Sequence, residues 1–179
     1  ITQVLGEIGN SKKINYYCPN HEQALAMAVD AYSRLRGFGV GLVTSGPGAT
    51  NLLTGVACSY YDSIPCLFFT GQVGQFHITG SRKVRQRGFQ ETDVISIFKP
   101  ITKFCYQLKN ANEVSYILDK AYYLATTGRP GPVLIDVPFN IQKQLVDLKT
   151  QKKFKNIIKT QKINNFQIIK SILKKSSKP

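Results

Sequence analysis

Residues 21–51 constrain the fold more than any other stretch, because they change secondary-structure signal three times within a short span. Glu22–Arg34 places its apolar residues at helical spacing. After a glycine turn, the apolar run Val40–Thr44 has the length of a strand, and the Gly/Pro turn Ser45–Gly48 leads into the helix-compatible stretch Ala49–Tyr60. Helix, strand, glycine turn and helix is the connectivity of a parallel sheet, where ligands bind at the carboxyl ends of strands. The Ser45–Gly48 turn falls at such an end.

The rest of the chain continues the alternation of strands and helices with mostly short connections. This pattern predicts an α/β fold, namely an open parallel sheet with helices on both faces. We expect Asn20 to cap the helix that starts at Glu22, and residues 71–91 to form a long irregular loop. The other predicted strands are Ile14–Cys18, Cys66–Thr70, Ile101–Leu108 and Val133–Val137, and the other predicted helices are Ile1–Ile8, Asp93–Phe98 and Asn112–Thr127.

The formal net charge of +14 is concentrated toward the C-terminal end. Residues 143–179 contain eleven lysines and one acid, Asp147. A block of like charge is usually a solvated segment, and no zinc finger or RNA-recognition signature accompanies it, so we predict no nucleic-acid partner. We divide the chain into a globular domain over residues 1–147 and a Lys-rich segment over residues 148–179, in which Ile163–Leu173 is predicted to form a short amphipathic helix.

The sequence supports neither a membrane-spanning protein nor a disulfide-stabilised one. No apolar run reaches the roughly 18 residues that a membrane-spanning helix needs, and the first residues lack the pattern of a signal peptide. Four cysteines are present, without a Cys-x-x-Cys pair, and each stands beside apolar or aromatic residues. Free thiols in apolar surroundings are typical of a reducing compartment, so we expect a cytoplasmic protein without membrane partners.

Two features of residues 21–51 could carry chemistry. Glu22 stands in the first turn of a helix, where an acid is also favourable for the helix alone. The Ser45–Gly48 turn could cradle a phosphate or let a flat ligand approach the backbone, or be simply a tight turn. His21-Glu22 lacks the second histidine of a zinc-protease motif, so no metal site is predicted. Ser45 lacks the Gly-x-Ser-x-Gly context of a nucleophile.

Seven short blocks occur in order between about residue 14 and residue 142. Together they resemble the N-terminal pyrimidine-binding domain of thiamine-diphosphate enzymes of the acetolactate synthase type. The blocks are HEQ at 21–23, LVTSGPGATN at 42–51, DSIP at 62–65, TGQV at 70–73, FQE at 89–91, KPITK at 99–103 and GRPGPV at 128–133.

The resemblance implies a role for several residues. In that family the glutamate matching Glu22 hydrogen-bonds N1′ of the cofactor's aminopyrimidine and promotes the tautomer that removes the thiazolium C2 proton. A carboxyl group removed from water has a raised pKa, which would suit this proton sharing. The residues expected to contact the cofactor are Glu22, Gly46, Pro47, Gly48, Asn51 and Gln90, of which Glu22 and Gln90 are also expected to be catalytic.

The resemblance also implies cofactors, partners and missing parts. The activity would be decarboxylation of a small-molecule 2-oxo acid and ligation of the carbanion to an acceptor, with a second subunit, in a homodimer or tetramer, completing the site. Thiamine diphosphate would bind with Mg²⁺ held by a C-terminal domain absent here, and FAD is a further possible cofactor. The family's first strand would lie upstream of Ile1, residues 148–179 would be a linker and the start of a truncated central domain, and this stretch alone is expected to be inactive.

Departures from the family pattern leave alternatives open. The loop between Gln72 and Gln90 is longer than in typical acetolactate synthases and has Gly74 where proline is usual, so the chain resembles a divergent branch. Its basic run, Arg82 to Arg87, is interpreted as solvated rather than as a contact for an anionic substrate. The alternative functions are another thiamine-diphosphate lyase or decarboxylase, or a non-catalytic α/β interaction module.

Overall fold

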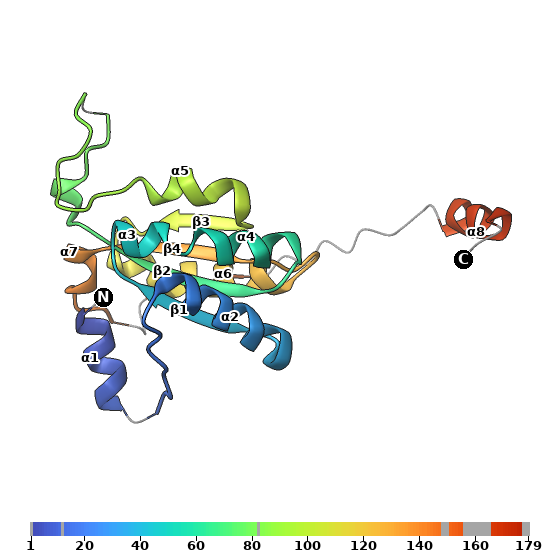
Figure 1. Ribbon diagram of the computed structural model, residues 1–179, viewed down its shortest axis with the longest axis horizontal. Helices are drawn as coiled ribbons and strands as arrows, with labels where there is room; N and C mark the ends of the chain where they lie inside the picture. The colour runs from blue at the N-terminus through green and yellow to red at the C-terminus, as the bar shows by residue number, and fades with distance from the viewer. Residues whose placement is uncertain (1, 12, 82, 148–150, 156–165, 177–179) are drawn as a thin grey trace.

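A four-stranded parallel sheet forms the centre of the protein, in the strand order β1-β2-β4-β3 (Figure 1). The computed structural model describes residues 2–11, 13–81, 83–147, 151–155 and 166–176. The strands are β1 (Gly39–Val43), β2 (Cys66–Gln72), β3 (Phe104–Gln107) and β4 (Val133–Pro138). The predicted open parallel sheet is therefore confirmed.

Helices cover both faces of this sheet, as predicted. Helices α2 (Glu22–Arg36), α4 (Leu53–Tyr61) and α5 (Val94–Phe98) pack on one face, and α6 (Val114–Thr126) packs on the other. The remaining helices are α1 (Thr2–Ser11), α3 (Pro47–Thr50), α7 (Phe139–Gln142) and α8 (Phe166–Lys175), with single 3-10 turns at Gln75–His77, Lys99–Ile101 and Ala111–Glu113.

Two apolar cores result from the alternation of side chains along the strands. Phe68 and Leu134 point toward α2, α4 and α5, whereas their neighbours Leu67 and Ile135 point toward α6. Successive side chains in a strand face opposite sides of a sheet, so a strand buried on both faces is continuously apolar. This explains why both strands begin with apolar runs in the sequence, residues 66–69 in β2 and residues 133–135 in β4.

Glycines let α2 approach its neighbours closely. A Cβ atom on Gly41 of β1 would lie 2.6 Å from Leu25 Cδ2, and one on Gly55 of α4 would lie 2.4 Å from Ala26 Cβ. Ala26 cannot move aside without its backbone, so only glycine fits at Gly55, and a larger residue at Gly41 would have to displace the Leu25 side chain. The close packing fixes the N-terminal end of α2, and with it Glu22, beside the end of β1.

The predicted strand Ile14–Cys18 is wrong: these residues form no strand and pair with no strand of the described chain. A strand needs a neighbour to bond its backbone, and none reaches this segment. The predicted cap Asn20 is also wrong, because His21 caps α2. Its Nδ1 accepts a hydrogen bond from the backbone N–H of Gln23 at 3.1 Å.

Two further elements differ in extent from the prediction. The helix predicted over Ala49–Tyr60 is divided into α3 and α4, because Leu52 N–H bonds to Ala49 O in a tighter turn at this junction. The strand predicted over Ile101–Leu108 shortens to β3, since Lys99–Ile101 forms a 3-10 turn containing Pro100. Proline fixes φ and lacks an N–H group, so it does not join a strand ladder here.

The C-terminal segment is described only in part. Gln151 packs on α6, where its Oε1 accepts from Ser115 N–H at 2.7 Å, and the Phe154 ring contacts those of Tyr116 and Tyr123. The predicted helix over Ile163–Leu173 corresponds to α8, although residues 163–165 and most of the predicted linker lie outside the described residues. The domain boundary after Asp147 stays a prediction. No helix among the described residues is long and apolar enough to cross a membrane.

We predict that Gly55→Ala lowers the free energy of unfolding by about 1–3 kcal/mol, because the new methyl group would overlap Ala26. Urea unfolding of this chain measures the effect. Gly6→Ala on α1 is the matched control, since a Cβ there meets nothing within 4 Å. Equal stability of the two variants would contradict the close packing of α2 on α4.

Candidate cofactor site

Glu22 is the first residue of α2, and its carboxylate faces α3 rather than open solvent. The side-chain amide of Asn51, at the end of α3, donates a hydrogen bond from Nδ2 to Glu22 Oε2 at 2.9 Å. Both side chains are half-buried. One carboxylate oxygen is thus occupied by Asn51, which leaves Oε1 as the oxygen that can meet a ligand.

The pKa of Glu22 is lowered, which corrects the expectation of a raised value. The hydrogen bond from Asn51 is the largest cause, and it outweighs the opposing effect of desolvation. A donor bound to the charged form favours ionisation. Glu22 is therefore a carboxylate at neutral pH in this structure.

The turn between β1 and α3 lies directly against this carboxylate. Gly46 has a φ of 61° and a ψ of −119°, a backbone conformation that residues with a side chain rarely adopt. Pro47 follows as the first residue of α3, where its fixed φ suits a helix start. Gly48 is buried, and a Cβ there would lie 3.5 Å from Glu22 Oε1. Bare backbone thus borders the free carboxylate oxygen.

Gln90 reaches the same turn from the long loop. A Cβ on Gly46 would lie 2.6 Å from the carbonyl oxygen of Gln90 and 2.7 Å from Gln90 Cβ. Gln90 itself has a φ of 57°, in the left-handed region. Both neighbours therefore depend on unusual backbone conformations at the point of contact.

The structure thus brings all six predicted site residues into one constellation. Glu22 contacts Asn51 and borders Gly48, Gly46 contacts Gln90, and Asn51 N–H bonds to Pro47 O at 2.9 Å. The residues come from three separate parts of the sequence. Their contacts do not by themselves assign a role, so their functions remain predictions.

Two polar side chains beside Gln90 were missed by sequence reasoning. Glu91 accepts hydrogen bonds from the loop, and Gln72, at the end of β2, bonds to Thr92. Glu91 belongs to the FQE block and Gln72 to the TGQV block. The spacing of residues in the sequence did not indicate their hydrogen-bond partners. Of the predicted basic run, residues 83–87 are exposed, and Arg82 lies outside the described residues.

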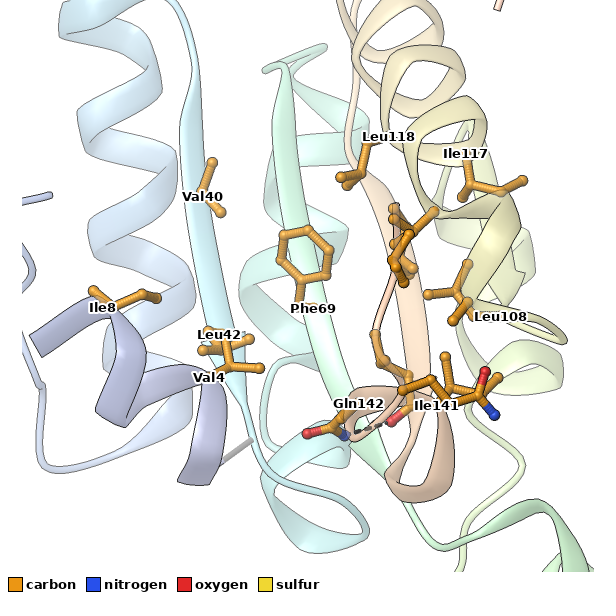
Figure 2. Close-up of a pocket in the computed structure, with 16 residues that line it drawn as sticks. Val4, Ile8, Val40, Leu42, Phe69, Leu108, Ile117, Leu118, Ile141 and Gln142 are labelled. Carbon is orange, nitrogen blue, oxygen red and sulfur yellow. Dashed lines mark hydrogen bonds between the residues drawn. The ribbon is translucent and has the colours of Figure 1, made fainter. Parts of the chain in front are cut away.

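The described residues offer no cluster of metal ligands, and a separate cavity is apolar. No group of three His, Cys, Asp or Glu side chains gathers within the described ranges. A cavity of about 340 Å³ lies on the opposite face of the sheet, bordered by α1, β1, β2 and α6. Figure 2 shows Ile8, Val40 and Phe69 lining it. Its apolar walls hold no acid or base, so the chemistry-bearing residues lie elsewhere.

Fold and site together define a class. A parallel α/β sheet that presents an acid and a glycine-lined turn at the carboxyl end of a strand is a cofactor-binding α/β domain. The chain belongs to the thiamine pyrophosphate enzyme family: residues 1–97 match the family described as thiamine pyrophosphate enzyme, N-terminal TPP binding domain. The resemblance inferred from the seven blocks is confirmed.

Curated relatives point the same way. The chain is 45% identical over 135 residues to the acetolactate synthase large subunit of Lactococcus lactis subsp. lactis (strain IL1403), covering 75% of this chain and 22% of the relative. It is 44% identical over 136 residues to an acetolactate synthase of Arthrospira platensis, covering 75% and 22%. Against the chloroplastic acetolactate synthase 2 of Nicotiana tabacum it is 43% identical over 137 residues, covering 76% and 20%. The chain therefore spans about a fifth of the length of these relatives.

We predict that Asn51→Ala raises the pKa of Glu22. The substitution removes the hydrogen bond that lowers this pKa most, while the desolvation that raises it remains. Carbon-13 NMR titration of the Glu22 carboxyl group measures it. Because the folded-state pKa is lowered, the Asn51 bond stabilises the fold above the unfolded-state pKa, and this stabilisation is lost as the pH falls through the folded-state value. Thr50→Ala is the control, since its hydroxyl bonds only to Pro47 O at 3.2 Å. An unchanged titration in Asn51→Ala would refute the assignment.

We also predict that Gly46→Ala displaces Gln90, because the methyl group would overlap the Gln90 carbonyl. Amide chemical shifts of residues 88–92 should then change. Gly37→Ala is the matched control: Gly37 also has a positive φ, 89°, but a Cβ there meets nothing within 4 Å. Both variants place a side chain at a positive φ, which strains the backbone, so similar shifts at Gln90 would show that strain, not contact, is responsible.

Proposed function

We propose that this chain is the pyrimidine-binding part of an acetolactate-synthase-like enzyme, which decarboxylates a 2-oxo acid and ligates the resulting carbanion to an acceptor. Membership of the thiamine pyrophosphate family and the names of the relatives support the proposal. The observation that carries it is the Glu22 carboxylate, held at one oxygen by Asn51 and bordered at the other by Gly48.

The site residues fit the pyrimidine end of thiamine diphosphate. Gly46 and Gly48 expose bare backbone, which allows a flat heterocycle to approach closely. When bound, thiamine diphosphate supplies the carbon nucleophile and electron sink that this chemistry needs. The residues proposed to contact it are Glu22, Gly46, Pro47, Gly48, Asn51 and Gln90.

Glu22 is proposed to hold and move a proton at Oε1. In this structure it is ionised, because Asn51 donates to Oε2. A ring placed over Oε1 would exclude water, and removal of water raises the pKa of a carboxyl group. The same residue would then be able to take up a proton and share it with a ring nitrogen, while Asn51 keeps the carboxylate oriented.

Other parts of the proposal concern the rest of the enzyme. Mg²⁺ and the diphosphate would be bound by a C-terminal domain, FAD is a further candidate cofactor, and a second subunit would complete the site. A 2-oxo acid is the proposed substrate, and Gln90 is proposed to face the reacting end of the cofactor. The four cysteines are all free in the structure, which supports the proposed cytoplasmic location.

We predict that Glu22→Gln lowers acetolactate formation by the full-length protein about 100-fold to 10,000-fold, the usual contribution of a general acid–base. Glutamine keeps a hydrogen bond to the ring but cannot transfer the proton, so cofactor affinity should change little. Release of acetolactate from pyruvate measures activity, and Glu7→Gln on the exposed part of α1 is the control.

Near-equal rates of wild type and Glu22→Gln would remove Glu22 from the mechanism. If the full-length protein forms no acetolactate but decarboxylates another 2-oxo acid, a different thiamine-diphosphate lyase is indicated. If it binds no thiamine diphosphate at all, a non-catalytic interaction module is indicated.

A further inference from the structure

Glu91, next to Gln90, collects hydrogen bonds from distant parts of the long loop. Its carboxylate accepts from the backbone N–H of Thr79 and from the Thr79 hydroxyl at 2.6 Å. It also accepts from the backbone N–H groups of Arg87 at 3.0 Å and Gly88 at 3.3 Å. One side chain therefore ties residues 79, 87 and 88 to the position immediately after Gln90.

The residue that follows Glu91 is bonded to the sheet. Gln72 Nε2 donates to Thr92 O at 2.8 Å and to Asp136 Oδ2 at 3.2 Å. Asp136 is buried in β4 and also accepts from Gln107 at 2.8 Å. Gln90 thus lies just before two consecutive anchors, one to the loop through Glu91 and one to the sheet through Thr92.

These anchors explain how Gln90 keeps its unusual backbone. A φ of 57° is unfavourable for a residue with a side chain, and such a conformation persists only where the surroundings determine it. Glu91 supplies four of the surrounding hydrogen bonds. Releasing them would let Gln90 relax and leave its contact with Gly46.

We infer that Glu91 is a positioning residue of the proposed cofactor site, which acts by fixing the loop so that Gln90 stays against Gly46. The effect of Glu91 on catalysis rests on the proposed function. Its effect on the position of Gln90 does not. Among the described residues, the hydrogen bonds of the Glu91 carboxylate go to Thr79, Arg87 and Gly88 rather than to Glu22 or Asn51. Its effect on the site would therefore pass through Gln90.

The lowered pKa of Glu91 keeps its side chain charged, as its hydrogen bonds to the loop require. Desolvation opposes ionisation, but the Thr79 hydroxyl and the backbone N–H groups of Thr79, Arg87 and Gly88 together lower the pKa of Glu91 to about 2. Hydrogen bonds to the charged form have this effect. The carboxylate therefore remains ionised wherever the enzyme would operate.

The chain offers a matched control in Glu113. Its carboxylate also accepts from two backbone N–H groups, those of Lys109 at 2.6 Å and Asn110 at 3.3 Å, and from the Tyr106 hydroxyl at 3.1 Å. It stands beyond β3, at the edge of the sheet farthest from β1. Glu113→Gln thus removes a similar set of bonds, none of which involves Thr79, Arg87 or Gly88.

The structural test compares amide hydrogen exchange in this chain. In Glu91→Gln, one carboxylate oxygen becomes an NH₂ group that faces N–H donors, so exchange of Thr79, Arg87 and Gly88 should accelerate at least tenfold, as expected for the loss of about 1.4 kcal/mol of protection. Glu113→Gln should leave these amides unchanged. Unchanged exchange in Glu91→Gln would overturn the inference regardless of what the enzyme does.

The functional test uses the full-length protein and measures acetolactate formation while thiamine diphosphate is titrated. Glu91→Gln should lower kcat about 10-fold to 100-fold, the scale of a misplaced active-site group, with less than a threefold change in the half-saturating cofactor concentration. Glu91→Asp should recover part of the rate because it keeps the charge, and Glu113→Gln should match wild type. A fall in Glu113→Gln equal to that in Glu91→Gln would show a general stability effect and overturn the inference.

The two proposals fail in different ways. If Glu22→Gln is inactive but Glu91→Gln has the wild-type kcat, Glu91 is not a positioning residue and the proposed function stands. If Glu22→Gln is fully active, the proposed function fails, while faster exchange at Thr79, Arg87 and Gly88 in Glu91→Gln would still establish the structural part of the inference.

Discussion

The close packing of α2 on β1 and α4 is the constraint on which the site depends. Gly41 and Gly55 have no side chains, so the helix lies nearer to both elements than any larger residue would allow. Because α2 begins at Glu22, its packing sets where the acid stands relative to the end of β1. Moving the helix outward by one methyl group would carry the carboxylate away from Asn51 and Gly48.

Three segments then converge on that acid, each held by a different kind of interaction. Asn51 orients the carboxylate by a hydrogen bond. The Gly46–Gly48 turn contributes backbone in place of side chains, and Gln90 arrives from a loop that bonds to itself through Glu91 and to the sheet through Gln72. The site therefore combines a rigid half built on the sheet with a half that depends on one loop.

The sequence predicted the sheet from local signals, and the resemblance to a family predicted the six candidate site residues, whose roles stay predictions. Apolar runs such as Cys66–Thr70 reveal buried strands, and the blocks around Glu22 and Gln90 resemble a family. Ile14–Cys18 was misread because its composition suits a strand while pairing depends on a distant neighbour. The lowered pKa of Glu22 was missed because it depends on Asn51, 29 positions away in sequence. Thr79, 12 positions from Glu91, was unpredictable for the same reason, and no regular spacing in the loop marked the nearer partners Arg87 and Gly88.

The outer margin of the sheet at β1 has a practical consequence. Within the described residues β1 pairs only with β2, and its Val40, which lines the cavity beside α1, is 56% exposed. An unpaired backbone margin beside apolar side chains is a template for another chain to join. We therefore expect this polypeptide, handled alone at high concentration, to be prone to self-association.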